Sequence, residues 1–262
     1  MSANPTSPLN GKLLFPFIAP PNGGKGTQTA ILSKRYNLPT FDMGATFRGI
    51  LKEGTDPELA TELQSYMSQG KLVPVQTVLK VFTRGFEALA KKHPDSEGFI
   101  LDGFPRNADQ ATGFAELCKQ WGAQIGKVIY LKVGMDVVAK RATGRRFCSN
   151  DATHVYNINE PRFMPQNKKL NADGSVAKDD KGNEIWLCDE PDQAELIIRA
   201  DDEPETVQKR LVEYQKETDP LIEHFRRAGQ LAEIDGARPA NEVTQDIEAQ
   251  IQPLLKKQPT TA

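Results

Sequence analysis

The 262-residue sequence predicts an α/β fold in which a parallel sheet is covered by helices. Three observations carry this prediction. Short apolar runs of strand length alternate with longer helical stretches over most of the chain. The first apolar run is followed at once by a glycine-rich loop and a helix. One long polar segment interrupts the alternation, which indicates an inserted part.

Five apolar runs are predicted to form the strands of the sheet. The first, at 13–18, is bounded by turn residues. Pro16 cannot donate to a central ladder, but the loop and helix that follow favour a strand all the same. The other strands are expected at 38–42, 99–101, 128–131 and 231–234.

Helices are predicted between these strands. The stretch 44–91 contains several, because Gly54, Gly70 and Pro74 break it. The other helices are expected at 27–36, 110–121, 137–143 and 243–255.

Composition excludes several classes of protein. The 33 Lys+Arg and 35 Asp+Glu residues give a net charge of -2, whereas dedicated nucleic-acid binders are usually basic. No apolar run is long enough to span a membrane, and the N-terminus does not have the pattern of a secretory signal. Three widely separated cysteines do not form a disulfide framework. We therefore expect a cytoplasmic globular protein without nucleic-acid or membrane partners.

The polar insertion runs from about Cys148 to Ala194 and is rich in Asn, Asp, Lys and Pro. A structureless loop of this length is improbable inside a compact domain, so we expect a small subdomain or a lid. The stretch 166–184 has the pattern of a surface hairpin around an N-A-D-G turn. The sequence assigns no function to it.

The glycine-rich loop A-P-P-N-G-G-K-G-T-Q, residues 19–28, lies between the first strand and the first helix. Such a loop directs backbone N–H groups and a lysine at phosphate oxygens. The match to G-x-x-x-x-G-K-[ST] is imperfect, because Ala19 holds the first glycine position and Gly26 holds the hydroxyl position. Taken alone, the loop leaves open an ordinary strand-to-helix turn with a solvated lysine.

Four further stretches remove most of that ambiguity. They are Gly70–Val73, G-F-I-L-D-G-F-P-R at 98–106 with Gln110, G-R-R at 144–146, and R-A-D-D at 199–202 with the segment up to Leu211. Together with G-K-G-T-Q they closely resemble adenylate kinases of the bacterial, long-lid type. The resemblance runs from about Leu13 to Leu255.

The resemblance implies a P-loop nucleoside monophosphate kinase fold with a five-stranded parallel sheet and two inserts. The N-terminal tail would be 1–12, the AMP-binding helical insert 42–73, and the β-rich lid 144–202. The core domain would comprise 13–41, 74–143 and 203–262. The implied activity is reversible, Mg²⁺-dependent phosphoryl transfer, ATP + AMP = 2 ADP, by a monomer that serves purine nucleotide homeostasis.

The resemblance also assigns roles to individual residues. The catalytic charges would be Lys25, Arg106, Arg141, Arg145, Arg199 and Arg210. ATP would contact Asn22, Gly23, Gly24, Lys25, Gly26, Thr27, Arg141, Arg145, Val155, Tyr156 and Arg238. AMP would contact Met43, Arg48, Lys71, Leu72, Val73, Gly103, Phe104, Pro105, Arg106, Gln110, Arg199 and Arg210. Asp102 would orient Mg²⁺ through water. Arginine suits such a site, because its planar fork is always charged and binds pairs of phosphate oxygens.

One departure from the family pattern concerns the acceptor segment. Where the family usually has T-G-D, this chain has Met43-Gly44-Ala45 and so lacks a hydroxyl and a carboxylate. Three alternatives therefore stay open: another nucleoside monophosphate kinase, an AMP kinase that prefers GTP, and a nucleotide-binding protein with little turnover. Since Lys25 and the arginines are all present, an adenylate kinase is the favoured interpretation.

The lid residues leave a choice between zinc and a metal-free polar cluster. Many family members bind zinc there with two C-x-x-C pairs. This chain offers Cys148, Asp151, Cys188 and Asp192, and His154 could replace one carboxylate. Structural zinc sites prefer sulfur and imidazole, so we favour the metal-free cluster.

Overall fold

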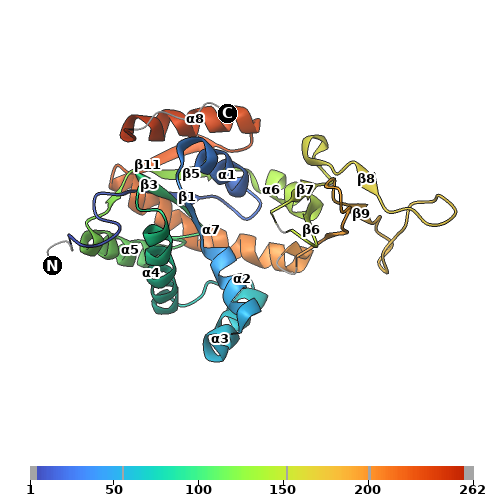
Figure 1. Cartoon of the computed structure of the whole chain (residues 1–262), viewed down its shortest axis with the longest axis horizontal. Helices are drawn as coiled ribbons and strands as arrows, with labels where there is room; N and C mark the ends of the chain where they lie inside the picture. The colour runs from blue at the N-terminus through green and yellow to red at the C-terminus, as the bar shows by residue number, and fades with distance from the viewer. Residues whose placement is uncertain (1–4, 55, 152, 200–201, 257–262) are drawn as a thin grey trace. The chain divides into compact units, whose positions relative to one another are not determined.

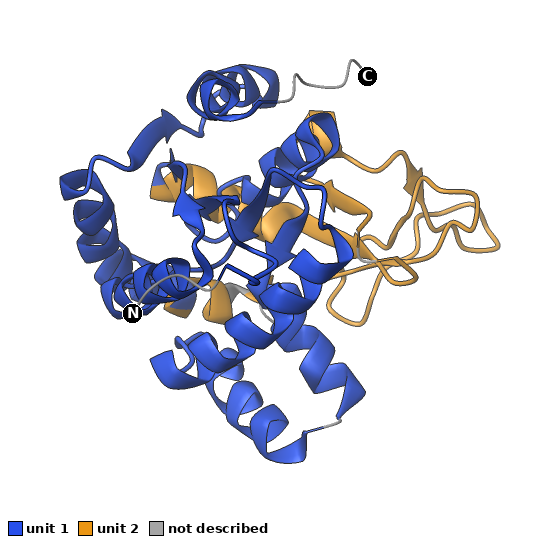
Figure 2. Cartoon of the chain, turned by 60° about the vertical axis from the view of Figure 1, so that its left-hand side comes forward, with its two compact units in different colours: residues 1–134, 210–262 blue, residues 135–209 orange. Residues whose placement is uncertain are grey.

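The structure is a computed structural model that describes residues 5–256, apart from 55, 152, 200 and 201. The chain divides into two compact units, one formed by residues 1–134 and 210–262, the other by residues 135–209 (Figure 2). The predicted helical insert lies in the first unit, and the predicted lid lies in the second.

A parallel sheet forms the centre of the first unit, as the sequence predicts (Figure 1). Its strands are ordered β11-β5-β1-β3-β2, and the two-residue strand β4 also pairs with β1. Their bounds are β1 Leu13–Ile18, β2 Thr40–Asp42, β3 Gly98–Asp102, β4 Gln124–Ile125, β5 Val128–Lys132 and β11 Leu231–Asp235. The prediction lacked only β4, because two residues are too few to show strand periodicity.

Pro16 is accommodated in this central strand by the way that β1 changes neighbours. One side of β1 pairs with β3 along its length. The other side pairs with β4 at Leu13 and Leu14, and with β5 at Phe17 and Ile18. Pro16 falls between these two pairings, so its missing N–H breaks no registered pair on that side.

Helices cover both faces of the sheet. Those of the first unit are α1 Lys25–Tyr36, α2 Met43–Glu53, α3 Pro57–Ser68, α4 Val75–Lys92, α5 Ala108–Trp121 and α8 Ala240–Ile251, with the 3₁₀ turn η3 Gln252–Leu254. On one face, Leu32 of α1 and Ile247 of α8 pack in one cluster with Phe15 and Phe17. On the other face, Phe82 of α4 packs with Leu14, Phe99 and Phe114 of α5.

The helix α7, Pro204–Arg227, was not predicted as an element. Its sequence is dominated by charges and contains Pro220, both of which mask an apolar stripe. Leu221 and Phe225 of this helix are buried and pack with Ile18 and Val128 of the sheet.

The second unit contains short antiparallel strands separated by longer irregular segments. Its elements are α6 Met135–Gly144, β6 Arg145–Cys148, β7 Val155–Asn157, the 3₁₀ turn η1 Pro161–Phe163, β8 Asn167–Lys168, β9 Trp186–Leu187 and β10 Leu196–Ile197. The strands form a sheet β10-β6-β7 and a pair β8-β9. The expected hairpin is present as the antiparallel bridge between Leu170 and Val176, and a second bridge joins Lys178 to Glu184.

Candidate functional site

The glycine-rich loop connects β1 to α1 through a tight turn. The N–H of Gly23 donates to the carbonyl of Pro20 at 2.9 Å. A Cβ on Gly23 would lie 2.9 Å from that same oxygen, so only glycine fits. Gly24 stands at the N-cap position of α1 in the left-handed region, at φ 88°. It has no side chain that could accept from the first N–H groups of the helix. The first N–H groups of α1 are thus the kind of donors that anions bind.

Asn22 stands at a second left-handed position of the loop, at φ 62°. Both polar atoms of its side-chain amide are buried, and no described residue forms a hydrogen bond with either. Asparagine tolerates this backbone conformation better than most residues. The predicted ATP-binding residues Asn22 to Thr27 form the end of this loop and the start of α1, and a Cβ at Gly26 would meet nothing within 4 Å.

Lys25, at the start of α1, forms a charged pair with Asp102, at the end of β3. Lys25 Nζ lies 3.8 Å from Asp102 Oδ1, and both side chains are less than one-fifth exposed. Burial lowers the pKa of Lys25, and the Asp102 carboxylate counteracts this effect. Burial likewise raises the pKa of Asp102, which Lys25 counteracts. Each charged group therefore offsets part of the desolvation cost of the other.

Two arginines complete the cationic cluster of the first unit. Desolvation and the neighbouring Arg210 lower the pKa of Arg106 to about 10, so Arg106 remains charged at neutral pH. Arg106 and Arg210 also lower the pKa of Lys25. Arg106 is exposed at the surface, from which an anion can reach it. Three cations in mutual repulsion are typical of a site built to hold polyanions.

The loop that carries Arg106 is held by Gln110, whose Oε1 accepts from the Arg106 N–H at 2.9 Å. Gln110 is 1% exposed. Phe104 is completely buried and stacks on Phe82 at 4.0 Å between ring centroids, while Gly103 adopts φ 79°. The predicted acceptor residues 103–106 thus form a rigid turn with the arginine at its end.

The other predicted AMP residues differ in exposure. Met43 is 2% exposed and packs in the core cluster with Phe47 and Phe104, so its side chain is a core residue. Val73 is also buried in this cluster, whereas Lys71 is exposed and Leu72 is partly buried. Arg48 of α2 is partly exposed and lies 3.9 Å from Asp42.

Arg141, Arg145 and Arg199 belong to the second unit, where each has a contact within that unit. Arg141 pairs with Glu160 at 2.8 Å. Arg145 binds the buried Asp202 through two hydrogen bonds. The Arg199 guanidinium lies 3.4 Å from the centroid of the Phe147 ring.

The predicted donor-base residues are in different surroundings. Val155 is 47% exposed. The Tyr156 hydroxyl lies 3.3 Å from Cys188 Sγ. Arg238 belongs to the first unit, where Asp235, Glu242 and Asp246 surround it.

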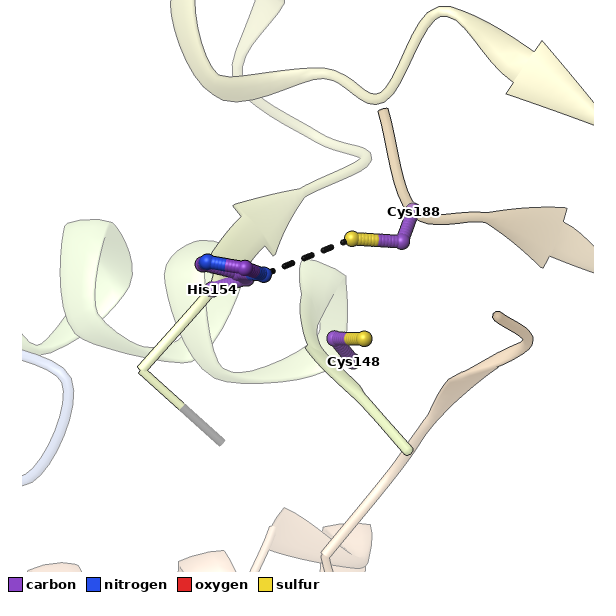
Figure 3. Close-up of side chains that lie close together, drawn as sticks. All are labelled: Cys148, His154 and Cys188. Carbon is purple, nitrogen blue, oxygen red and sulfur yellow. Dashed lines mark hydrogen bonds between the residues drawn. The ribbon is translucent and has the colours of Figure 1, made fainter. Parts of the chain in front are cut away.

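The second unit also brings together two sulfur atoms and an imidazole. The ligand atoms of Cys148, His154 and Cys188 all lie within 4.8 Å of one another (Figure 3). His154 Nδ1 is 3.6 Å from Cys188 Sγ. Asp151 accepts from Thr153 and lies 3.6 Å from Nε2 of His154, whereas Asp192 accepts from Asn150 and from the Ala194 N–H. The set contains both predicted cysteines and His154, which the sequence offered in place of one carboxylate; among the described residues, Asp151 and Asp192 are not grouped with them.

These features define a P-loop protein that binds nucleotide phosphates. The glycine-rich loop with its lysine lies between the first parallel strand and a helix, and it faces an aspartate and two arginines. The family model for adenylate kinases matches residues 17–230. The chain belongs to the adenylate kinase family.

Three relatives illustrate the similarity. An adenylate kinase of Streptomyces avermitilis is 36% identical over 233 residues, which cover 87% of this chain and 92% of the relative. One of Clostridioides difficile is 34% identical over 234 residues, with 89% and 95% covered. One of Bacillus subtilis is 34% identical over 227 residues, with 87% and 92% covered. Within the described part of the chain, no helix is both long and apolar enough to cross a membrane.

Proposed function

We propose that this chain catalyses the reversible reaction ATP + AMP = 2 ADP. The observation that carries the proposal is the cluster of Lys25, Asp102, Arg106 and Arg210 behind the glycine-rich loop. Phosphoryl transfer between two nucleotides needs positioning and charge stabilisation more than a general base. The family match and the names of the relatives support the same activity.

The proposed roles are those that the family resemblance assigns, and the chemistry of each group suits them. Lys25 steadies the transferring phosphoryl group, and the N–H groups at the start of α1 hold the donor phosphates. Arg106 and Arg210 hold the acceptor phosphate. Arg141, Arg145 and Arg199 of the second unit close around the phosphate chain, and Arg238, Val155 and Tyr156 contact the donor base.

Magnesium fits the carboxylate of Asp102, because Mg²⁺ prefers hard oxygen ligands and usually keeps several waters. When bound with ATP, the ion neutralises phosphate charge. Asp102 would hold it through water, and Lys25 at 3.8 Å counteracts the rise that burial causes in the pKa of Asp102. We further propose a cytoplasmic monomer that balances purine nucleotides.

A panel of nucleotides tests the proposed reaction. We expect kcat/KM with ATP to be at least about a hundredfold higher for AMP than for CMP, UMP or GMP, because a site that bonds one base edge rejects others strongly. The same panel with GTP as donor distinguishes an AMP kinase that prefers GTP. A better acceptor than AMP would contradict the assignment, and binding of both nucleotides without turnover would favour a binding protein.

We propose in addition that Cys148, His154 and Cys188 bind Zn²⁺. Thiolates and imidazole are the ligands that zinc prefers, and a fourth ligand such as water would complete the tetrahedral coordination. Their mutual distances, within 4.8 Å, support this set over one with Asp151 and Asp192. The bound metal would stabilise the fold of the second unit.

Metal analysis of purified variants tests the zinc proposal. Wild-type protein should carry close to one equivalent of zinc, and Cys148→Ser, His154→Ala and Cys188→Ser should each lose it and lower the Tm. Asp192→Asn is the matched control that should keep the metal, because Asp192 bonds Asn150 and the Ala194 N–H and contacts none of the three ligands. If the wild-type protein remained free of zinc after exposure to Zn²⁺, that result would support the metal-free polar cluster. In that cluster Cys188 contacts Tyr156 and His154.

A further inference from the structure

Asp42 lies at the same edge of the sheet as Lys25 and Asp102, although the motifs do not include it. It ends β2, and in the parallel register it is the direct partner of Asp102 at the end of β3. The two carboxylates therefore follow neighbouring strands at the edge where parallel sheets place their ligand sites. The charge of Asp42 raises the pKa of both Lys25 and Asp102.

The carboxylate of Asp42 has two partners on α2. Its Oδ1 accepts from the Ala45 N–H at 2.9 Å, which caps the helix. Its Oδ2 lies 3.9 Å from Nη2 of Arg48. The cap bond fixes the orientation of the carboxylate, so the second oxygen has a defined direction towards the arginine.

Gly44 makes this contact sterically feasible. A Cβ at this position would lie 3.1 Å from Nη1 of Arg48 and 3.2 Å from Oδ1 of Asp42. The guanidinium therefore extends back over the bare backbone of Gly44 towards the N-terminus of α2, where the cap and the strand ends are. The ion pair with Asp42 therefore restrains the long Arg48 side chain near the strand ends.

We propose that Asp42 is a positioning residue that holds Arg48 ready for the acceptor phosphate, and that it takes over the carboxylate that the family pattern places at position 45. The inference rests on the proposed function, in which Arg48 contacts AMP. Ordering the arginine before binding lowers the entropic cost of binding AMP. Ala45 is exposed and three residues before Arg48, so a carboxylate at either position can reach the guanidinium.

The sign of one measurement separates positioning from simple charge. A carboxylate that contributed only its charge would repel the AMP dianion, so Asp42→Asn would tighten AMP binding. A positioning carboxylate gives the opposite result, and we expect Asp42→Asn to weaken AMP binding about fivefold by calorimetry. Asparagine still caps a helix, so α2 should remain intact. The KM for AMP should rise equally, while kcat and the KM for ATP change less than about twofold.

Three further variants complete the test. Asp56→Asn is the matched control, because Asp56 caps the neighbouring helix α3 through the Leu59 N–H, and it should leave AMP affinity unchanged. Asp42→Asn should add nothing to Arg48→Ala, because the two act through one contact. Ala45→Asp should restore AMP affinity to Asp42→Asn.

The outcomes are distinct. Unchanged or tighter AMP binding by Asp42→Asn would overturn the positioning role, and weaker binding that Ala45→Asp does not restore would overturn the relocated carboxylate. Wild-type protein that binds no AMP would instead overturn the proposed function on which the inference rests.

Discussion

Lys25→Met is expected to lower kcat by about a thousandfold and to leave the protein folded. The lysine is the one cation of the glycine-rich loop, and a single preorganised donor to a developing phosphate charge contributes about 10²–10³ in rate, or more where the charge is full. Methionine keeps the length and apolar character of the lysine stem, so packing changes little. A coupled assay in both directions measures the effect.

The same variant should change how stability depends on pH. Lys25 lowers the pKa of Asp102, which burial otherwise raises. Without Lys25, that pKa rises further above its unfolded value, so the native state binds the proton more tightly. The Tm of Lys25→Met should therefore increase, relative to wild type, as the pH falls from 7 towards 5.

Lys34→Met is the matched control for Lys25→Met, because Lys34 is an exposed lysine near the end of the same helix. It should retain wild-type turnover and the wild-type pH dependence of stability. More than one-tenth of wild-type activity in Lys25→Met would contradict the role given to Lys25.

The sequence predicted the sheet well because its strands carry strong local signals. The runs at 13–18, 128–131 and 231–234 are strands in the structure, and the glycine-rich loop lies where expected. The helix α7 was missed, since its apolar residues are separated by charges and interrupted by Pro220. Only packing against Ile18 and Val128 identifies its buried face.

The candidate site was harder to predict where spacing along the chain does not determine distance. Counting residues favoured Asp151 and Asp192 beside the two cysteines, but the fold brings His154 to the sulfur atoms instead. The family pattern indicated that the acceptor segment lacks a carboxylate at Ala45, while the sheet register places Asp42 opposite Asp102. Both results depend on strand pairing that no short motif encodes.

Arg106→Ala is expected to reduce kcat/KM for AMP by about a thousandfold while the Tm stays the same or rises by a few degrees. The loss of activity follows from removing a paired donor to the acceptor phosphate. The gain in stability follows from electrostatics: desolvation and Arg210 lower the pKa of Arg106 to about 10, below its unfolded value. At pH 7 the arginine is protonated in both states, so this cost to folding is present and disappears with the side chain, but solvent screening keeps it small because Arg106 is exposed.

A loss of activity together with a gain in stability in Arg106→Ala would identify Arg106 as a residue that serves function at a cost to the stability of the fold. Arg106→Lys keeps the charge but not the planar fork, so it should retain the repulsion from Arg210 and recover only a small part of the activity. Arg84→Ala removes an exposed arginine of α4 and should change neither quantity. A large fall in the Tm of Arg106→Ala would instead mean that the guanidinium supports the turn at 103–106, because the lost activity would then follow from local unfolding.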